Sequence, residues 1–346
     1  MSWAEVQVLK NEIKKNGGTF PSIILIDSNG DMAGKAITIK DENGLFTHTY
    51  TFPNDGTTYL KCDVDYLAKW YISYSSGDRT KNLFANVDSI GGILSNVFQP
   101  VSWANGSDSE ISTMVSLADI GMINLSDYWS INDERVVSVS DIAATGSCDG
   151  ISWTVGEAHA AQNITLVLME KDLYDLVTPT VGGRTKCNFV YGMKDCFNEK
   201  GYMNSSNTNA GSWNSCARRN WCNGGFRGAL PEAIRNISKQ FKCPTINEYN
   251  GSTIVYSNDY FALHAEKEIF GSRTHSNATE ANALTHLTYY KTAANRIKKV
   301  NGTADYWWER SPRSSYTSSF CVVYSDGSAH NYGASSSFGV SVCGCI

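Results

Sequence analysis

Two acidic residues and a set of cysteines are the first candidates for chemistry, because paired carboxylates can catalyse hydrolysis and cysteines can bind metal ions or form disulfides. Glu266 and Glu268 are carboxylates two positions apart, and glycoside hydrolases place a pair of carboxylates on either side of a scissile bond. In the short helix expected around them, residues two apart point in different directions. They therefore cannot flank one bond, and an exposed helical surface is the better interpretation of both.

The cysteines do not have the spacing of a metal or disulfide framework. The chain has ten, and nine of them follow residue 140. No Cys-x-x-Cys pair occurs, and the histidines are not at zinc-finger spacing. The sequence predicts reduced thiols that pack as small core residues, with one or two disulfides as the alternative. Calcium is not predicted either, because Asp326 fits a turn, so no metal ion and no cofactor are expected.

Residues 311–346 differ in composition from the rest of the chain. Eleven of these 36 residues are serine, and the only formal charges are Arg313 and Asp326. Tyrosine for rigid amphipathic contact, with serine, asparagine and glycine for adaptable hydrogen bonding, is the composition of antibody binding loops. A serine-rich surface loop without a ligand is the alternative. The segment directly follows Trp307 and Trp308, which imply a rigid scaffold, and this favours a recognition surface.

A hairpin is expected to carry that surface, with strands at 320–324 and 329–332 around an Asp326-Gly327 turn. Alternation along the strands is expected to point Tyr324, His330 and Tyr332 outward and to turn Phe320, Val322 and Phe338 toward the packing. The residues predicted to bind a ligand are Arg313, Tyr316, Ser318, Tyr324, His330, Asn331, Tyr332, Ser335 and Ser336. The residues predicted to be scaffold are Trp307, Trp308, Arg310, Phe320 and Gly339.

Composition argues against several classes of partner. The chain of 346 residues has a formal net charge of −5 and no stripe of arginine and lysine, whereas phosphate binding needs a basic face, so nucleic acid is not expected. No segment approaches the ~20 apolar residues that span a bilayer. The N-terminus has no apolar signal-peptide core, so the protein is expected to be made in the cytoplasm.

The first hundred residues are predicted to form an antiparallel β-sandwich after one helix. The helix begins with a capping box of Ser2 and Glu5 and ends at Gly17-Gly18. Asn-Gly and Asp-Gly dipeptides, which are strong hairpin signals, separate the β-rich runs. The expected strands cover residues 23–26, 36–39, 45–52 and 59–64. No acid, base or nucleophile clusters here, so a scaffold or attachment role is expected.

A connector and a larger domain are predicted to follow. Ser107 and Glu110 form a second capping box, and the helix after them is expected to end at Gly121. Its apolar side consists of Ile111, Met114, Val115 and Ala118. Strands are then expected at 136–139, 151–155 and 164–169, helices at 231–241 and 266–270, and strands again at the end, with the terminal strands joining one sheet. The predicted organisation is a β-rich domain over residues 1–100, a connector helix within 101–127 and an α+β domain over 128–346.

The last domain resembles a known family in several ordered motifs. At the end of the chain these are Trp307-Trp308-Glu309-Arg310-Ser311-Pro312, Phe320-Cys321-Val322-Val323-Tyr324, Asp326-Gly327-Ser328 and Phe338-Gly339-Val340. Upstream they begin at Tyr128, Ala158, Gly201, Cys216 and Glu266. This pattern is similar to that of bacterial and phage proteins with a C-type-lectin-like fold, related to variable proteins diversified by retroelements and to formylglycine-generating enzymes. Two positions depart from the family: Val340-Ser341-Val342-Cys343 replaces an Arg/Ser-Pro ending, and His264 stands where a serine helix cap is expected.

The resemblance implies a phage tail-tip receptor-binding protein, or adhesin, located on the virion. Its partners would be a glycan or protein of the bacterial host surface and, through residues 1–100, other tail proteins. A homotrimer and retroelement diversification of the hairpin are further implications. The alternatives are a structural tail or baseplate component, a formylglycine-generating oxidase using Cys321, Cys343 and Cys345, and a cell-wall glycan hydrolase. Because the motif around those cysteines does not fit the oxidase, the protein is expected not to be an enzyme.

Overall fold

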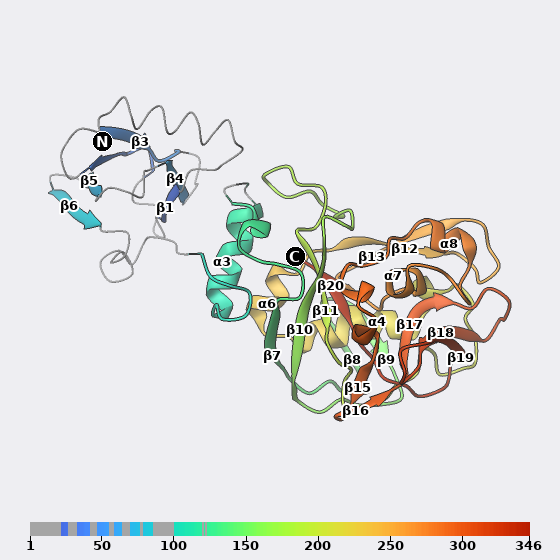
Figure 1. Cartoon of the computed structure of the whole chain (residues 1–346). Helices are drawn as coiled ribbons and strands as arrows, with labels where there is room; N and C mark the ends of the chain where they lie inside the picture. Colours follow the sequence, from blue (N-terminus) through green and yellow to red (C-terminus); the bar gives the residue numbers. More distant parts are fainter. Residues whose placement is uncertain are drawn as a thin grey trace. The chain divides into compact units, whose positions relative to one another are not determined.

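A computed structural model describes most of the chain, which divides into two compact units, residues 1–100 and residues 101–346 (Figure 1). The described residues are 22–26, 33–41, 47–54, 59–63, 70–76, 79–85, 100–119, 121 and 123–346. No helix among them is long and apolar enough to cross a membrane.

The described part of the first unit consists of antiparallel strands. These are β1 (Ser22–Ile26), β2 (Ala36–Asp41), β3 (Thr47–Thr51), β4 (Tyr59–Asp63), β5 (Trp70–Ser76) and β6 (Arg79–Ala85). Strands β1 and β4 pair with each other, and the order β3-β2-β5-β6 forms a four-stranded sheet. The predicted strands of this region are therefore confirmed, whereas the expected first helix and the three Asn-Gly and Asp-Gly turns lie outside the described residues.

The second unit combines short helices with small antiparallel sheets. Its helices are α3 (Asp108–Asp119), η2 (Leu125–Asp127), η3 (Trp213–Ser215), α4 (Ala217–Trp221), the π-helical η4 (Cys222–Phe226), α5 (Arg227–Ala229), α6 (Glu232–Ile237), α7 (Glu266–Phe270), α8 (Ala278–Asn282), η5 (Tyr289–Lys291) and η6 (Ala293–Arg296). Its strands are β7 (Glu134–Val139), β8 (Thr145–Cys148), β9 (Ile151–Thr154), β10 (Gln162–Lys171), β11 (Phe189–Met193), β12 (Phe241–Ile246), β13 (Ile254–Asp259), β14 (Phe261–Ala262), β15 (Lys298–Val300), β16 (Thr303–Asp305), β17 (Trp307–Pro312), β18 (Ser319–Val323), β19 (Ala329–Gly333) and β20 (Cys343–Cys345).

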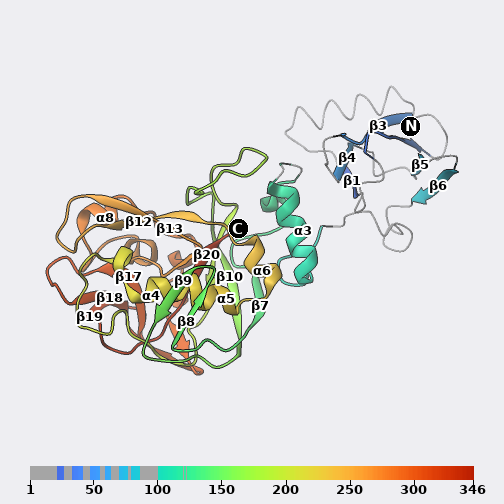
Figure 2. The same cartoon turned by 180° about the vertical axis from the view of Figure 1, so that it is seen from behind.

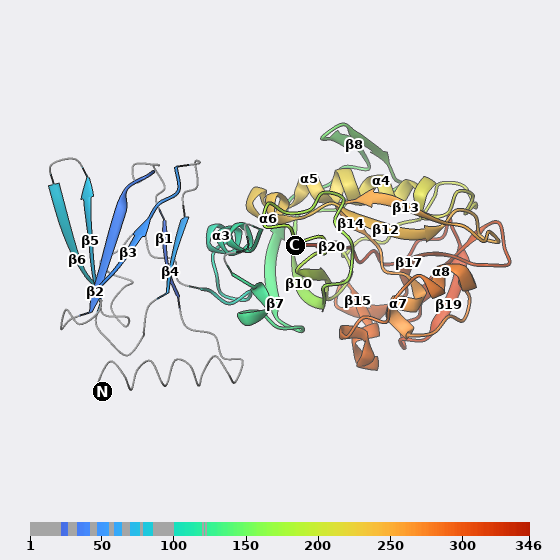
Figure 3. The same ribbon diagram turned by 90° about the horizontal axis from the view of Figure 1, so that it is seen from above.

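Five strands in the order β14-β20-β11-β10-β7 form the largest sheet of this unit. Strands β17, β18 and β19 form a separate sheet, and three two-stranded hairpins complete the set. All ladders between these strands are antiparallel, so the coarse prediction of an α+β architecture is confirmed. The expectation that the terminal strands share one sheet holds for β20 only. Within the unit, β19 and α3 lie at opposite ends (Figures 1, 2 and 3).

Helix α3 forms because its ends are capped and one side is apolar. Ser107 N–H donates to Oε2 of Glu110 at 2.8 Å, and Ser107 Oγ accepts the backbone N–H of Glu110 at 3.3 Å, as the capping box predicts. Gly121 follows the helix with a φ of +76°, a conformation that glycine adopts without strain. The helix packs against α6, and Arg135 of β7 donates to the carbonyls of Trp103 and Gly106. The predicted connector is thus part of the second unit.

Two helix boundaries differ from the sequence prediction. Helix α6 ends at Ile237 rather than at 241, because Phe241 begins β12 and pairs opposite Asp259 of β13. Tertiary strand pairing here overrides the helical spacing of the apolar residues. Helix α7 is capped at Ala265, not at His264: Oε2 of Glu268 accepts the N–H of Ala265 at 2.9 Å. The left-handed Gly271 ends this helix as expected, with a φ of +72°.

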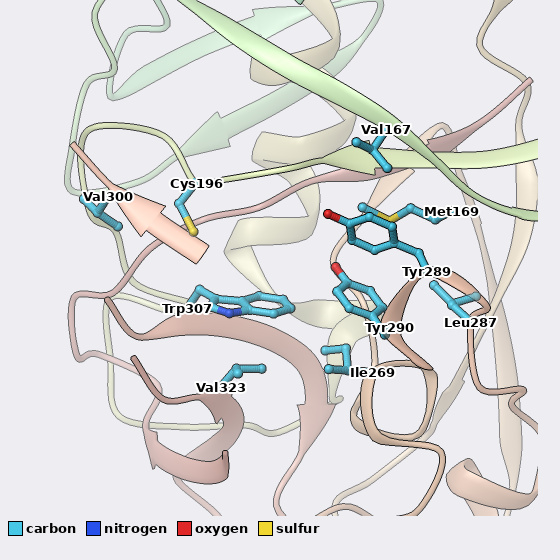
Figure 4. Packing of buried hydrophobic residues seen from close by; sticks show 10 residues of the cluster. All are labelled: Val167, Met169, Cys196, Ile269, Leu287, Tyr289, Tyr290, Val300, Trp307 and Val323. Carbon is cyan, nitrogen blue, oxygen red and sulfur yellow. The ribbon is translucent and has the colours of Figure 1, made fainter. Parts of the chain in front are cut away.

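Trp307 lies in a hydrophobic core that joins β10, β17 and β18 (Figure 4). Its ring stacks with that of Tyr290 at 6.2 Å between centroids, and Val323 packs in the same cluster. Trp307 Nε1 donates to the carbonyl of Arg296 at 2.9 Å, and Trp308 Nε1 donates to the carbonyl of Gly201 at 2.7 Å. Both tryptophans are fully buried, so they fix β17 from its two faces.

Candidate functional site

The three-stranded sheet positions the predicted hairpin. Strands β18 and β19 pair with Phe320 opposite Tyr332 and Val322 opposite His330, so the members of each pair share a face. Strand alternation therefore does not separate tyrosines from packing residues, contrary to the prediction. The separation arises because β18 is the central strand and is buried throughout, whereas every residue of β19, at the edge, is half-buried.

A tight turn joins these two strands, as the Asp-Gly dipeptide predicts. Oδ1 of Asp326 accepts the backbone N–H and the hydroxyl of Ser328, at 2.9 and 2.6 Å. Gly327 has a φ of +82°, which favours glycine at this position. The Ser328 hydrogen bonds lower the pKa of Asp326, so its carboxylate belongs to the turn and is already occupied.

Five half-buried rings form an aromatic cluster across the three-stranded sheet, from the start of β17 through the end of β18 to β19. Its members are Tyr306, Tyr324, His330, Tyr332 and Phe338. The rings of Tyr306, Tyr324 and His330 stack in a row, with 4.3 Å between neighbouring centroids. Phe338 packs at 4.8 Å from Tyr332 and 5.5 Å from Tyr306. Because stacked rings cover one another's faces, the cluster presents ring edges and hydroxyls to a ligand.

Two hydroxyls of the cluster, those of Tyr324 and Tyr332, are hydrogen-bonded to each other. Tyr324 Oη donates to Tyr332 Oη at 3.4 Å. This hydrogen bond raises the pKa of Tyr324 to about 12. The two hydroxyls therefore act as a donor and acceptor pair on a rigid support, which is the property expected of tyrosines in a binding surface.

Polar and basic side chains adjoin the aromatic cluster. Nη1 of Arg313 donates to Oδ1 of Asn331 at 2.7 Å, and the guanidinium lies 3.7 Å from the centre of the Tyr316 ring. Nδ2 of Asn331 is 3.4 Å from Nδ1 of His275, whose ring is 5.8 Å from that of His330. Arg313, Tyr316 and Asn331 are thus brought together with His330, and His275 links the two groups.

A buried asparagine fixes the loop that carries Tyr316. Nδ2 of Asn209 donates to the carbonyls of Tyr316 and Ser319, both at 2.7 Å. The backbone N–H of Asn209 donates to the carbonyl of Thr317 at 2.9 Å. The loop therefore has a defined conformation even though half of the Tyr316 side chain is exposed.

The predicted serines lie beside the same sheet. The carbonyl of Ser318 accepts the N–H of Ala334 at 2.7 Å, and Ser336 N–H donates to the carbonyl of Gly333 at 2.9 Å. Ser335 is exposed, and Ser318 and Ser336 are half-buried. All nine predicted ligand-binding residues are therefore accessible at least in part. Tyr306 and His275 were not predicted, because only the folded chain brings them to the hairpin.

The acidic pair of the α7 helix has a structural role. Glu266 and Glu268 are fully buried, so their predicted position on an exposed helical surface is wrong. Glu266 accepts the backbone N–H groups of His275 and Ser276, at 2.9 and 2.8 Å, and thereby orients the loop that carries His275. Glu268 forms a two-pronged ion pair with Arg310, at 2.7 Å for each hydrogen bond. These bonds occupy both carboxylates.

A third buried acid, Glu309, has no hydrogen-bond partner at either carboxyl oxygen. Burial, followed by the nearby Glu266 and Glu280, raises its pKa well above the ordinary range. Burial, followed by Glu266, Glu309 and Glu280, raises the pKa of the Cys321 thiol. A neutral thiol is a poor metal ligand, and no three His, Cys, Asp or Glu side chains of the described chain are arranged to hold a metal ion.

The sequence comparisons reach only part of the second unit. Residues 185–346 match a family described as "Domain of unknown function (DUF6273)". The matched range contains β11 to β20, and with them the whole three-stranded sheet. No curated protein and no solved structure matches the chain.

Proposed function

We propose that the second unit is a recognition domain with a C-type-lectin-like fold, and that the protein is a phage tail-tip adhesin. In this proposal the three-stranded sheet binds a glycan or protein of the bacterial host surface. The first unit attaches the protein to other tail components of the virion, and three copies assemble. The ordered motifs that resemble the family, from Tyr128 to Val340, support this assignment.

The aromatic cluster is the observation that supports the proposal most. Three stacked rings and two further aromatic side chains stay half-exposed on a sheet whose central strand is buried. A rigid group of tyrosines with free ring edges loses little conformational entropy on binding, and such residues commonly dominate interface energetics. The loops with Arg313 and Tyr316 extend the same surface.

The enzymatic alternatives have less support from the geometry of this unit. Glu268 is fully buried and paired with Arg310, so it is not available to a glycan. Cys321, Cys343 and Cys345 are buried, and burial raises the pKa of each thiol. A structural tail component remains the alternative function, and it predicts no binding to a cell surface.

Replacing Tyr316, Tyr324 and Tyr332 together by serine tests the proposal. Purified protein is incubated with a panel of bacterial cell envelopes, and the bound fraction and the thermal melt are both measured. We expect normal melting of the variant and binding at least about tenfold weaker, equivalent to ~1.4 kcal/mol. The matched control is Tyr256→Ser, because Tyr256 is also exposed but belongs to β13.

Two results would contradict the proposal. One is a triple variant that melts normally and binds the envelopes as tightly as the parent. The other is a parent protein that binds no envelope, which is the outcome expected of a structural tail component.

A further inference from the structure

Most arginines of the second unit are neutralised by an acidic side chain. The ion-paired arginines are Arg135, Arg184, Arg218, Arg219, Arg227 and Arg310. The arginines of this unit without a described carboxylate in ion-pair distance are Arg235, Arg273, Arg296 and Arg313. Although the chain has a net charge of −5, these four arginines have no acidic partner in the described part of the chain and keep their positive charge uncompensated by an ion pair.

Two of the unpaired arginines meet at one residue beside the aromatic cluster. Ser276 forms a β-bridge with Arg313, and Nη1 of Arg273 donates to the carbonyl of Ser276 at 3.4 Å. Arg273 is exposed and Arg313 is half-buried. The bridge and the hydrogen bond thus bring two accessible arginine residues to the same buried serine.

Arg313 is held in place while part of its guanidinium remains free. The Tyr316 ring and Oδ1 of Asn331 fix the group, through the 3.7 Å cation–π contact and the 2.7 Å hydrogen bond. Nε and Nη2 have no acceptor among the hydrogen bonds of the described chain. A guanidinium oriented in this way can form two parallel hydrogen bonds to a carboxylate or phosphate.

His275 adds a further donor. Its Nδ1 faces Nδ2 of Asn331 at 3.4 Å, and Asn331 Oδ1 is already the acceptor for Arg313. The amide nitrogen is therefore a donor, and Nδ1 of His275 accepts from it. In that tautomer Nε2 carries the hydrogen. His275 consequently presents an N–H group, as the two arginines do.

The acidic side chain that contacts this loop binds the backbone of the loop and neither arginine. Glu266 is fully buried and bonded to the backbone N–H groups of His275 and Ser276. No described carboxylate forms an ion pair with either surface arginine. Asp326, the one formal negative charge of residues 311–346, is occupied by the hairpin turn. Donors thus predominate around Ser276.

We propose that Arg273, His275 and Arg313 form an anion-binding subsite of the recognition surface, which takes a phosphate or carboxylate group of the ligand. This inference rests on the proposed function and narrows the ligand to an acidic polymer of the cell surface. The aromatic cluster binds the uncharged part of the same molecule, next to the charged group.

Three immobilised polymers serve as probes for the full chain. Poly(glycerol phosphate) supplies phosphate, polygalacturonate supplies carboxylate, and dextran is the neutral control. We expect the parent protein to bind one of the acidic polymers, which identifies the source of the anion, and not dextran. The binding is expected to weaken as salt rises from 50 to about 500 mM, since ions screen exposed charges.

Arginine variants locate the interaction. Arg313→Gln is expected to weaken binding of the acidic polymer by about tenfold, the effect of losing one charge-assisted pair. Arg273→Gln is expected to weaken it as well. Arg313→Lys keeps the charge and loses the planar fork, so an intermediate loss is expected. Arg235→Gln is the matched control, because Arg235 is half-buried and unpaired on α6.

The outcomes separate this inference from the function on which it rests. If the parent binds cell envelopes but neither acidic polymer, or if Arg313→Gln binds the polymer like the parent, the subsite is refuted and the recognition function stands. If the parent binds no envelope, the recognition function itself fails. A thermal melt of each variant shows whether a loss of binding reflects a loss of folding, and Arg273→Gln, at an exposed position, supplies the test if Arg313→Gln is unstable.

Discussion

Glu309→Gln should make the second unit more stable than the parent, by a margin that grows as the pH rises. Glu309 is fully buried on β17, and neither of its carboxyl oxygens has a hydrogen-bond partner. Burial, then the neighbouring Glu266 and Glu280, raises its pKa well above 4.5. The folded protein therefore keeps this carboxyl protonated, whereas the unfolded chain releases the proton in mildly acidic solution.

The sign follows from the number of protons bound by each state. Above about pH 4.5 the folded state binds one proton more than the unfolded state, so the free energy of unfolding falls as the pH rises. The loss is about 1.4 kcal/mol for each pH unit until the pH reaches the pKa of the folded state. Glutamine fills the same volume and does not ionise, so it removes this loss.

Urea denaturation of the parent and the variant at pH 5, 6, 7 and 8 measures the difference, with tryptophan fluorescence as the signal. We expect the two proteins to have nearly equal free energies of unfolding at pH 5. By pH 7 the free energy of unfolding of the variant should exceed that of the parent by up to about 3 kcal/mol. Glu268→Gln is the matched control, because it leaves Arg310 buried without its ion-pair partner and should destabilise at neutral pH by ~3–5 kcal/mol. A difference between parent and Glu309→Gln that does not change with pH would refute the reasoning.

Two further predictions concern the core. Trp307→Ala should lower the free energy of unfolding by ~3–5 kcal/mol, and Trp307→Phe by less; a thermal melt of the alanine variant that matches the parent would exclude a scaffold role. In the native protein a thiol reagent should label the half-buried Cys148, and the eight buried cysteines of the second unit should react only after unfolding. Mass spectrometry of the labelled peptides checks this, and rapid native labelling of Cys321 would contradict the burial described for it.

Local signals in the sequence predicted several elements correctly. The Ser107 and Glu110 capping box begins α3, and Gly271 ends α7, because caps and left-handed glycines act within one helical turn. The turn at Asp326 likewise depends on neighbouring residues only. The central position of β18, which leaves Tyr332 on an edge strand, depends on pairing with β17 and could not be read from strand alternation.

Features that depend on distant partners were missed. The burial of Glu268 is possible because the carboxylate pairs with Arg310. The two residues are 42 positions apart, and the sequence does not show that they meet. His275 reaches the hairpin because Glu266 holds its backbone. Charged residues are rarely fully buried unless they are paired. Because the partners of Glu266 and Glu268 are distant in the sequence, the two glutamates were predicted to lie on an exposed helical surface.

The division between a buried central strand and an accessible edge strand has a consequence for evolution. Ladder hydrogen bonds between β18 and β19 use backbone groups, so side chains on β19 can be exchanged while the pairing persists. Changes of His330, Asn331 or Tyr332 should alter which ligand is bound with little loss of folding free energy, whereas β18 tolerates few changes. Under the proposed function, related chains should therefore differ mostly along β19, so that one scaffold would serve different host surfaces.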